Sequence, residues 1–130
     1  MANPNLLAAT TASGTTTYYT PGVTTAVVLA PNAASSGQVF KINQIVVSNL
    51  TSSAATATVQ LYTNGAVAQG SAPSGGTAYS IAYQISVPAN ATLIVSDKTT
   101  AIYLQEGTSI TVTSGTASAL TYTMSYEVIS

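Results

Sequence analysis

The chain has 130 residues and a formal net charge of −1, and it contains neither cysteine nor histidine. Charged residues make up 4% of it, too few to neutralise nucleic-acid phosphates or to bind an anionic membrane surface, so we expect neither as a partner. The missing histidine and cysteine exclude Ser-His-Asp and Cys-His catalysis and metal sites built on imidazole or thiolate ligands.

The first 22 residues are predicted to be an extended N-terminal arm, and residues 23–130 a single folded domain. The arm is rich in Thr, Ala, Ser and Gly, a composition typical of a disordered terminus. Leu6, Leu7, Tyr18 and Tyr19 would then be exposed to solvent, which favours docking of the arm on another surface. Both alternatives, a floppy end and a docked arm, are open.

Short strands separated by turns are predicted along the rest of the chain. Apolar runs, many of them alternating with polar residues, predict strands at 23–29, 39–48, 56–63, 79–87, 92–96, 102–104, 110–112 and 121–128. No segment has an apolar repeat near 3.6 residues, and abundant Thr and Val disfavour helix. The sequence therefore predicts an all-β, single-domain antiparallel β-sandwich of about eight strands, either jelly-roll-like or immunoglobulin-like.

The strand at 39–48 changes its apolar face. Phe40 and Ile42 share one parity, whereas Ile45 and Val47 share the other. A β-bulge near Asn43 and Gln44 would produce this change, and so would a strand covered on both faces.

The tyrosines divide into two groups. Those that share parity with apolar neighbours in their strands, and are therefore expected in the core, are Tyr79, Tyr83, Tyr122 and Tyr126. Those left for a contact surface, together with Leu6 and Leu7, are Tyr18, Tyr19, Tyr62 and Tyr103. A surface of this kind could contact another protein or stack on a sugar.

The carboxylates Asp97, Glu106 and Glu127 are far apart in the sequence. A fold could bring two of them together as a glycosidase pair, but Asp97 and Glu106 fall in predicted loops, where solvated carboxylates are the simpler interpretation. No stretch supplies the several oxygen ligands that calcium needs. We therefore expect no enzyme activity, no cofactor and no metal.

Sheet edges and one long loop are the places where a partner is expected. The glycine-rich segment 65–77 is the longest internal loop, and such loops often carry contacts. Native sheets protect their edges with Lys, Glu or Pro, and this chain has almost no charge for that purpose. Exposed edges would suit a subunit of a homo-oligomer that is covered on assembly.

Four stretches carry a resemblance to a known group: MANPNLL, VFKINQIVVSNLTSSAATATVQLY, ISVPANATLIVSDKTTAIYLQEGTSITVTS and TYTMSYEVIS. Together they resemble the small virion structural proteins of tailed phages that infect cyanobacteria. The resemblance implies a head decoration or cement protein that binds the major capsid protein and neighbouring copies of itself. It also permits a tail or fibre position, as an adhesion or carbohydrate-binding module. The implied location is the capsid surface of the virion, after synthesis in the host cytoplasm, and the start of the chain lacks the pattern of a secretory signal.

Overall fold

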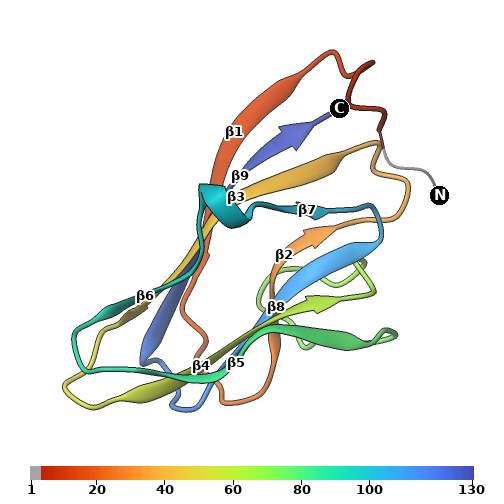
Figure 1. Cartoon of the computed structure of the whole chain (residues 1–130). Helices are drawn as coiled ribbons and strands as arrows, with labels where there is room; N and C mark the ends of the chain where they lie inside the picture. The colour runs from red at the N-terminus through yellow and green to blue at the C-terminus, as the bar shows by residue number, and fades with distance from the viewer. Residues whose placement is uncertain (1–3) are drawn as a thin grey trace.

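The computed structural model describes residues 4–130, which form nine β-strands and one short 3-10 turn, η1. The strands are β1 (Ala12–Tyr19), β2 (Val27–Asn32), β3 (Val39–Asn49), β4 (Ala55–Tyr62), β5 (Ala78–Val87), β6 (Thr92–Ser96), β7 (Ile102–Leu104), β8 (Thr108–Ser114) and β9 (Leu120–Ile129). They make two antiparallel sheets that pack face to face (Figure 1), which confirms the predicted β-sandwich. Within the described residues, no helix is long and apolar enough to cross a membrane.

The strand order identifies the type of sandwich. Sheet A has the order β1-β9-β3-β6, with β7 also paired to β3, and sheet B has the order β2-β8-β4-β5. The turn η1 (Lys98–Thr100) separates β6 from β7, so these two act as one interrupted strand beside β3. With β6 and β7 counted together, the sandwich has two four-stranded sheets and the connectivity of a jelly roll rather than of an immunoglobulin domain.

Much of the predicted arm is a strand of the sandwich. β1 pairs with β9 along its whole length, and the amides of Thr10 and Thr11 donate to the carbonyl oxygen of Ser130 at 2.8 and 3.0 Å. The hydroxyls of Thr16 and Ser125 lie 3.1 Å apart across the same pair of strands. Residues 12–19, which fall within the predicted arm, thus form an edge strand of sheet A.

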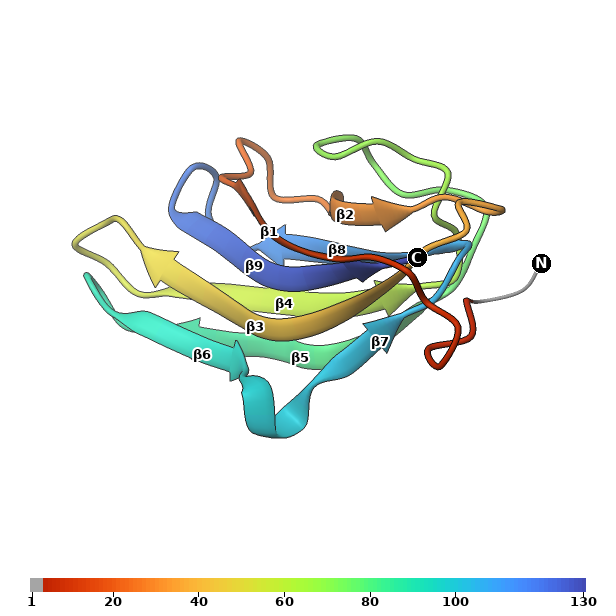
Figure 2. The same ribbon diagram turned by 90° about the horizontal axis from the view of Figure 1, so that it is seen from above.

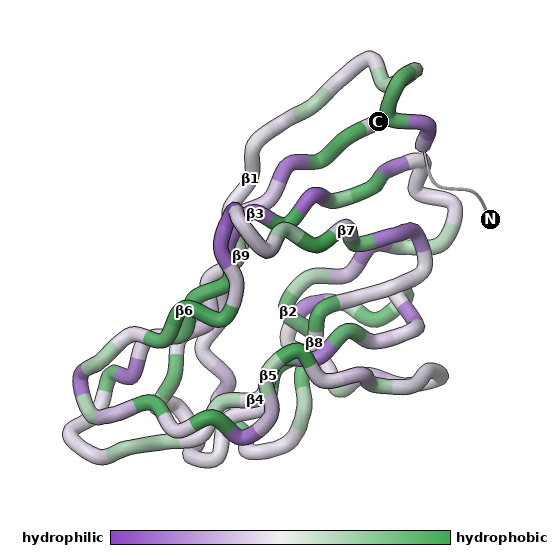
Figure 3. Tube along the Cα trace, viewed as in Figure 1, coloured by the Kyte–Doolittle hydropathy of each residue, from purple (hydrophilic) through white to green (hydrophobic). Residues whose placement is uncertain are grey.

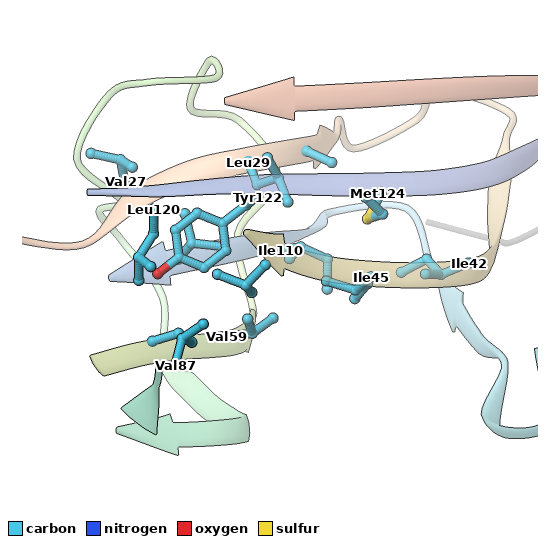
Figure 4. Close-up of a cluster of buried hydrophobic side chains, with 14 of the residues drawn as sticks. Val27, Leu29, Ile42, Ile45, Val59, Val87, Ile110, Leu120, Tyr122 and Met124 are labelled. Atoms are coloured by element: carbon cyan, nitrogen blue, oxygen red, sulfur yellow. The ribbon is translucent and has the colours of Figure 1, made fainter. Parts of the chain in front are cut away.

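The core lies between the sheets (Figure 4). Tyr122 and Met124 of β9 are fully buried, as their parity predicts. The hydroxyl of Tyr122 donates to the carbonyl oxygen of Thr113 at 2.9 Å and lies 3.1 Å from the hydroxyl of Ser114. A phenol can be buried at this depth because its polar end has these partners.

The predicted bulge in β3 is confirmed. The pairing of β3 with β9 shifts register between Ile42 and Gln44, which makes Asn43 the extra residue. Ile42 and Ile45 can therefore both face the core, although they differ in parity.

The predicted core positions of Tyr79 and Tyr83 are wrong. Tyr79 and Tyr83 are 60% and 61% exposed, and Ile85 of the same strand is 41% exposed. β5 is an edge strand of sheet B, and its pairing with β4 shifts register twice. At the second shift Gln84 has a φ of 49° and donates its N–H to Thr58 Oγ1 at 2.9 Å. These bulges break the period of two on which the prediction depended.

Candidate interaction surfaces

The three carboxylates lie on different elements. Asp97 precedes η1, Glu106 lies in the turn between β7 and β8, and Glu127 lies on β9. Glu106 is 6% exposed, so the expectation that it is solvated is wrong. Among residues 4–130, no three His, Cys, Asp or Glu side chains are grouped so as to hold a metal ion.

The N-terminal segment presents its two leucines on a tight turn. The N–H of Leu7 donates to Asn5 Oδ1 at 3.0 Å, and the N–H of Ala8 donates to the carbonyl oxygen of Asn5 at 3.0 Å. This Asx turn leaves Leu7 97% exposed. Leu6 lies beside Tyr103 at a hollow of about 220 Å³. Leu6 and Tyr103 are thus two predicted contact residues that the fold brings together.

Tyr18 and Tyr103 both lie on the outer face of sheet A. Tyr18 is opposite Thr123 of β9, and the same row continues through Val46 of β3 to Ile94 of β6. Tyr103 belongs to another row, opposite Lys41. Residues paired directly across antiparallel strands project from the same face, so these two exposed tyrosines face the same way without forming one cluster.

The other two predicted contact tyrosines, Tyr19 and Tyr62, pack toward the interior of the sandwich. Tyr19 is opposite Tyr122 and packs against the core. Tyr62 is buried, and its hydroxyl accepts the N–H of Gly76 at 3.0 Å. Tyr62 is therefore not an exposed contact residue, because the loop that follows β4 folds back over it.

That loop, predicted as a contact site, binds the edge of the chain's own sheet B. The N–H of Gly70 donates to the carbonyl oxygen of Val28 at 2.8 Å, and the N–H of Val28 donates to the carbonyl oxygen of Ser71 at 2.9 Å. Gln69 Nε2 donates to the carbonyl oxygen of Leu29 at 2.8 Å. The loop thereby pairs the N–H and carbonyl of Val28 and the carbonyl of Leu29 on the edge strand β2.

The opposite side of the sandwich has no such cover among the described residues. β5 and β6 lie along this side, away from β1 and β2 (Figure 2). The exposed large apolar residues of these two strands are Tyr79, Tyr83, Ile85 and Ile94, and we call them the β5–β6 side. Figure 3 shows hydrophobic stretches along both strands. No charged residue occurs from Ala78 to Ser96.

The β5–β6 side has almost no signature in the sequence. An alternating strand reads the same whether its apolar residues face a core or an uncovered edge. The one available signal was the absence of charge over two consecutive strands, which is unusual for edges that meet only water.

Two hollows lie on the outer face of sheet A. Hollow 1, of about 520 Å³, is lined by Asn43, Gln44, Asp97, Lys98, Thr99 and Ser125. Hollow 2, of about 390 Å³, is lined by Leu6, Ala9, Thr10, Thr11, Ala12, Lys41, Tyr103, Glu127 and Ile129. Hydrogen bonds from the side chain and the N–H of Thr99 lower the pKa of Asp97, so this carboxylate is ionised at neutral pH.

Comparison with known proteins identifies no relative. No protein family, no curated protein and no solved structure matches the chain. A functional interpretation therefore depends on the surfaces described above and on the resemblance of the four sequence stretches.

Proposed function

We propose that the chain is a non-enzymatic structural protein of a phage virion, a head decoration or cement protein that binds and stabilises the lattice of the major capsid protein. The observation that carries the proposal is the β5–β6 side, where four large apolar residues are 41% to 61% exposed on two strands without charge. Large apolar side chains left exposed on two edge strands support this side as a place where another protein binds. The resemblance to small virion proteins supports the major capsid protein as that partner.

The stabilising effect follows from burial. Each large apolar side chain that becomes fully covered contributes about 1.5–3 kcal/mol. Because the chain would bind the folded lattice and not its unfolded subunits, binding shifts the equilibrium toward the assembled shell. With so few charges, the contact should depend little on salt concentration.

The two bulges in β5 define how this side makes contact. A bulged edge strand is a poor template for an added strand, because the ladder is interrupted and the edge is twisted. Contact through Tyr83 and Ile85 side chains is therefore favoured over extension of sheet B by a strand of the partner. Such docking allows a specific contact without open-ended sheet growth.

The jelly-roll connectivity is compatible with this role. Viral capsid domains and lectins both use jelly rolls. A fold does not determine a function, so this analogy supports a virion role and a sugar-binding role equally.

Imaging of intact virions that contain this chain tests the proposal. We expect a near-atomic reconstruction to place the chain on the head, with Tyr83 and Ile94 covered by the major capsid protein. Density for the chain on the tail alone would overturn the head assignment.

The alternative is a tail or fibre module for adhesion or carbohydrate binding. The two hollows on sheet A favour it, because both offer hydrogen-bonding groups and hollow 2 adds the exposed ring of Tyr103. A tail position in the reconstruction would support this alternative.

A further inference from the structure

The accessible charges of this chain gather around the two hollows. Of two basic and three acidic side chains in the sequence, Asp97 and Lys98 line hollow 1, and Lys41 and Glu127 line hollow 2. The remaining one, Glu106, is buried. The four accessible charged side chains therefore all lie around the two hollows.

The two hollows adjoin each other. Asn43 of hollow 1 donates from Nδ2 to Glu127 Oε1 of hollow 2 at 3.1 Å. Ser125 of hollow 1 is two residues from Glu127 on β9, so both side chains project from the same face. Each hollow has a volume in the range of ligand sites, roughly 300–1,000 Å³.

Hollow 1 is shaped by irregularities in two strands. Asn43 and Gln44 are consecutive and would point to opposite faces of a regular strand, but the bulge in β3 allows both to line the same hollow. The pairing of β3 with β6 also shifts register, just before η1. Bulges that re-aim side chains are common at binding sites.

The part of hollow 1 lined by Asp97, Lys98 and Thr99 is a capped turn. Asp97 Oδ1 accepts the N–H of Thr99 at 2.9 Å, and the hydroxyl of Thr100 accepts the N–H of Asp97 at 3.2 Å. This capping box fixes the backbone of η1. Side chains held in place before a ligand arrives lose less entropy on binding.

The lining groups select the ligand by their chemistry. Amides, hydroxyls, one carboxylate and one ammonium line hollow 1, and the two charges cancel. The ammonium of Lys41 in hollow 2 is likewise accompanied by the carboxylate of Glu127. An anionic ligand would meet a carboxylate in each hollow, whereas a neutral polyhydroxylated ligand can donate to the carboxylates and accept from the amides.

Asn43 has an unused acceptor. Its Oδ1 is buried and has no hydrogen-bond partner within the described part of the chain. A buried acceptor without a partner costs about 1–3 kcal/mol. A ligand hydroxyl that reached this oxygen would remove the cost.

Hollow 2 adds apolar surface. Tyr103 is 48% exposed, and Leu6 and Ile129 lie beside it. An aromatic face next to aliphatic groups suits the C–H face of a pyranose ring, while the ring hydroxyls remain available to polar neighbours.

We propose that hollows 1 and 2 together form a binding site for a neutral oligosaccharide, with sugar hydroxyls on Gln44, Asp97 and Lys98 and a sugar ring against Tyr103. None of these residues belongs to the β5–β6 side. The inference specifies the site for the adhesion alternative and does not depend on where the chain lies on the particle.

An array of neutral glycans, probed with the purified full chain, tests this site. We expect at least one neutral oligosaccharide to bind, and titration of that glycan to shift the side-chain amide signals of Asn43 and Gln44 in NMR spectra. Gln44→Ala and Asp97→Asn should each weaken binding at least 10-fold. The matched control is Gln60→Ala on sheet B, which should leave binding unchanged.

Three results would overturn the proposal. The first is an array on which no neutral glycan binds, and the second is binding of anionic glycans only. The third is a bound glycan that shifts signals elsewhere and leaves those of Asn43 and Gln44 in place. The NMR readout uses the unaltered chain, so it decides the question even if a variant folds poorly.

Discussion

Gln69 donates a hydrogen bond from Nε2 to the carbonyl oxygen of Leu29 at 2.8 Å. The same amide group donates to Thr17 Oγ1 at 2.8 Å, so one side chain of the long loop ties β1 to β2. These are the edge strands of the two sheets on one side of the sandwich. The opposite edges, β5 and β6, expose Tyr83 and Ile94 instead. The sandwich therefore has a closed side and an open side, and the open side is where we expect the partner.

The closed side should depend measurably on Gln69. Gln69→Ala removes the hydrogen bonds to Leu29 and Thr17, and we expect the free energy of unfolding to fall by about 1 kcal/mol. Urea unfolding measures the loss, and hydrogen exchange should show a less protected amide at Val28. Gln60→Ala, which removes only an exposed hydrogen bond to Ser80, should cost less. Equal losses would mean that Gln69 does not tie the edges.

The loop also depends on a glycine at its start. A Cβ on Gly65 would lie 2.0 Å from the carbonyl oxygen of Asn32, so Gly65→Ala forces backbone to move. We expect a loss of about 3 kcal/mol or more in thermal unfolding. Gly14→Ala is the control, because a Cβ there meets nothing within 4 Å. If Gly65→Ala left the stability unchanged, the loop would be able to move away from β2 at little cost in free energy.

Two isoleucines that differ in burial should differ in how much stability is lost when each is replaced by alanine. Ile42→Ala leaves a cavity in the core and should cost about 2–5 kcal/mol, because Ile42 is fully buried. Ile94→Ala removes a side chain that is 59% exposed, and should change the stability of the isolated chain by less than about 0.5 kcal/mol. Chemical denaturation compares the two. A large loss for Ile94→Ala would place that side chain in the fold rather than on a free surface.

Alkaline pH should destabilise the chain through two phenols, the buried Tyr122 and the partly buried Tyr126. Burial raises the pKa of Tyr122 and of Tyr126, so the folded state retains these protons longer than the unfolded state does. The stabilisation that the two protonated phenols give the folded state is therefore complete below about pH 10, the ordinary tyrosine pKa. It is lost as the pH rises through the pKa values of these phenols in the folded state.

Tyr122→Phe separates the two effects of that phenol. Its hydrogen bonds to Thr113 and Ser114 are removed, so the variant should be about 1–2 kcal/mol less stable at neutral pH. It should also lose less stability than the unaltered chain between neutral and alkaline pH. Melting temperatures measured from neutral to alkaline pH report both the loss at neutral pH and the weaker pH dependence. If the melting temperatures of the variant and the unaltered chain fell in parallel, Tyr122 would not be a source of the pH dependence.

The sequence predicted most strands because β-branched and apolar runs have a recognisable period. It missed β1, since residues such as Gly14 and Thr16 give no apolar signal and the strand is specified by pairing with β9. It also ended β2 before Pro31, although an edge strand tolerates proline. Both errors concern edge strands, β1 and β2. Which strands lie at an edge is decided by the topology of the whole chain and not by the local sequence.

The surfaces were harder to predict than the strands. Leu7, Tyr18 and Tyr103 could be identified as exposed, and the bulge at Asn43 could be located from a change of parity. The β5–β6 side could not, because the bulge at Gln84 leaves no sequence pattern. Hollow 1 joins Asn43 of β3 with Asp97 at the start of η1, and only the jelly-roll topology brings them together.

The most direct test of the central claim is the binding of purified variants to virions that lack this chain. Tyr83→Lys and Ile94→Lys place charges on the β5–β6 side, and each should weaken binding at least about 30-fold, the effect expected for a hot-spot residue. Val23→Lys adds the same charge at an exposed position between β1 and β2, on the closed side, and should bind like the unaltered chain. If both β5–β6 variants bound as tightly as Val23→Lys, the open side would not be the docking surface.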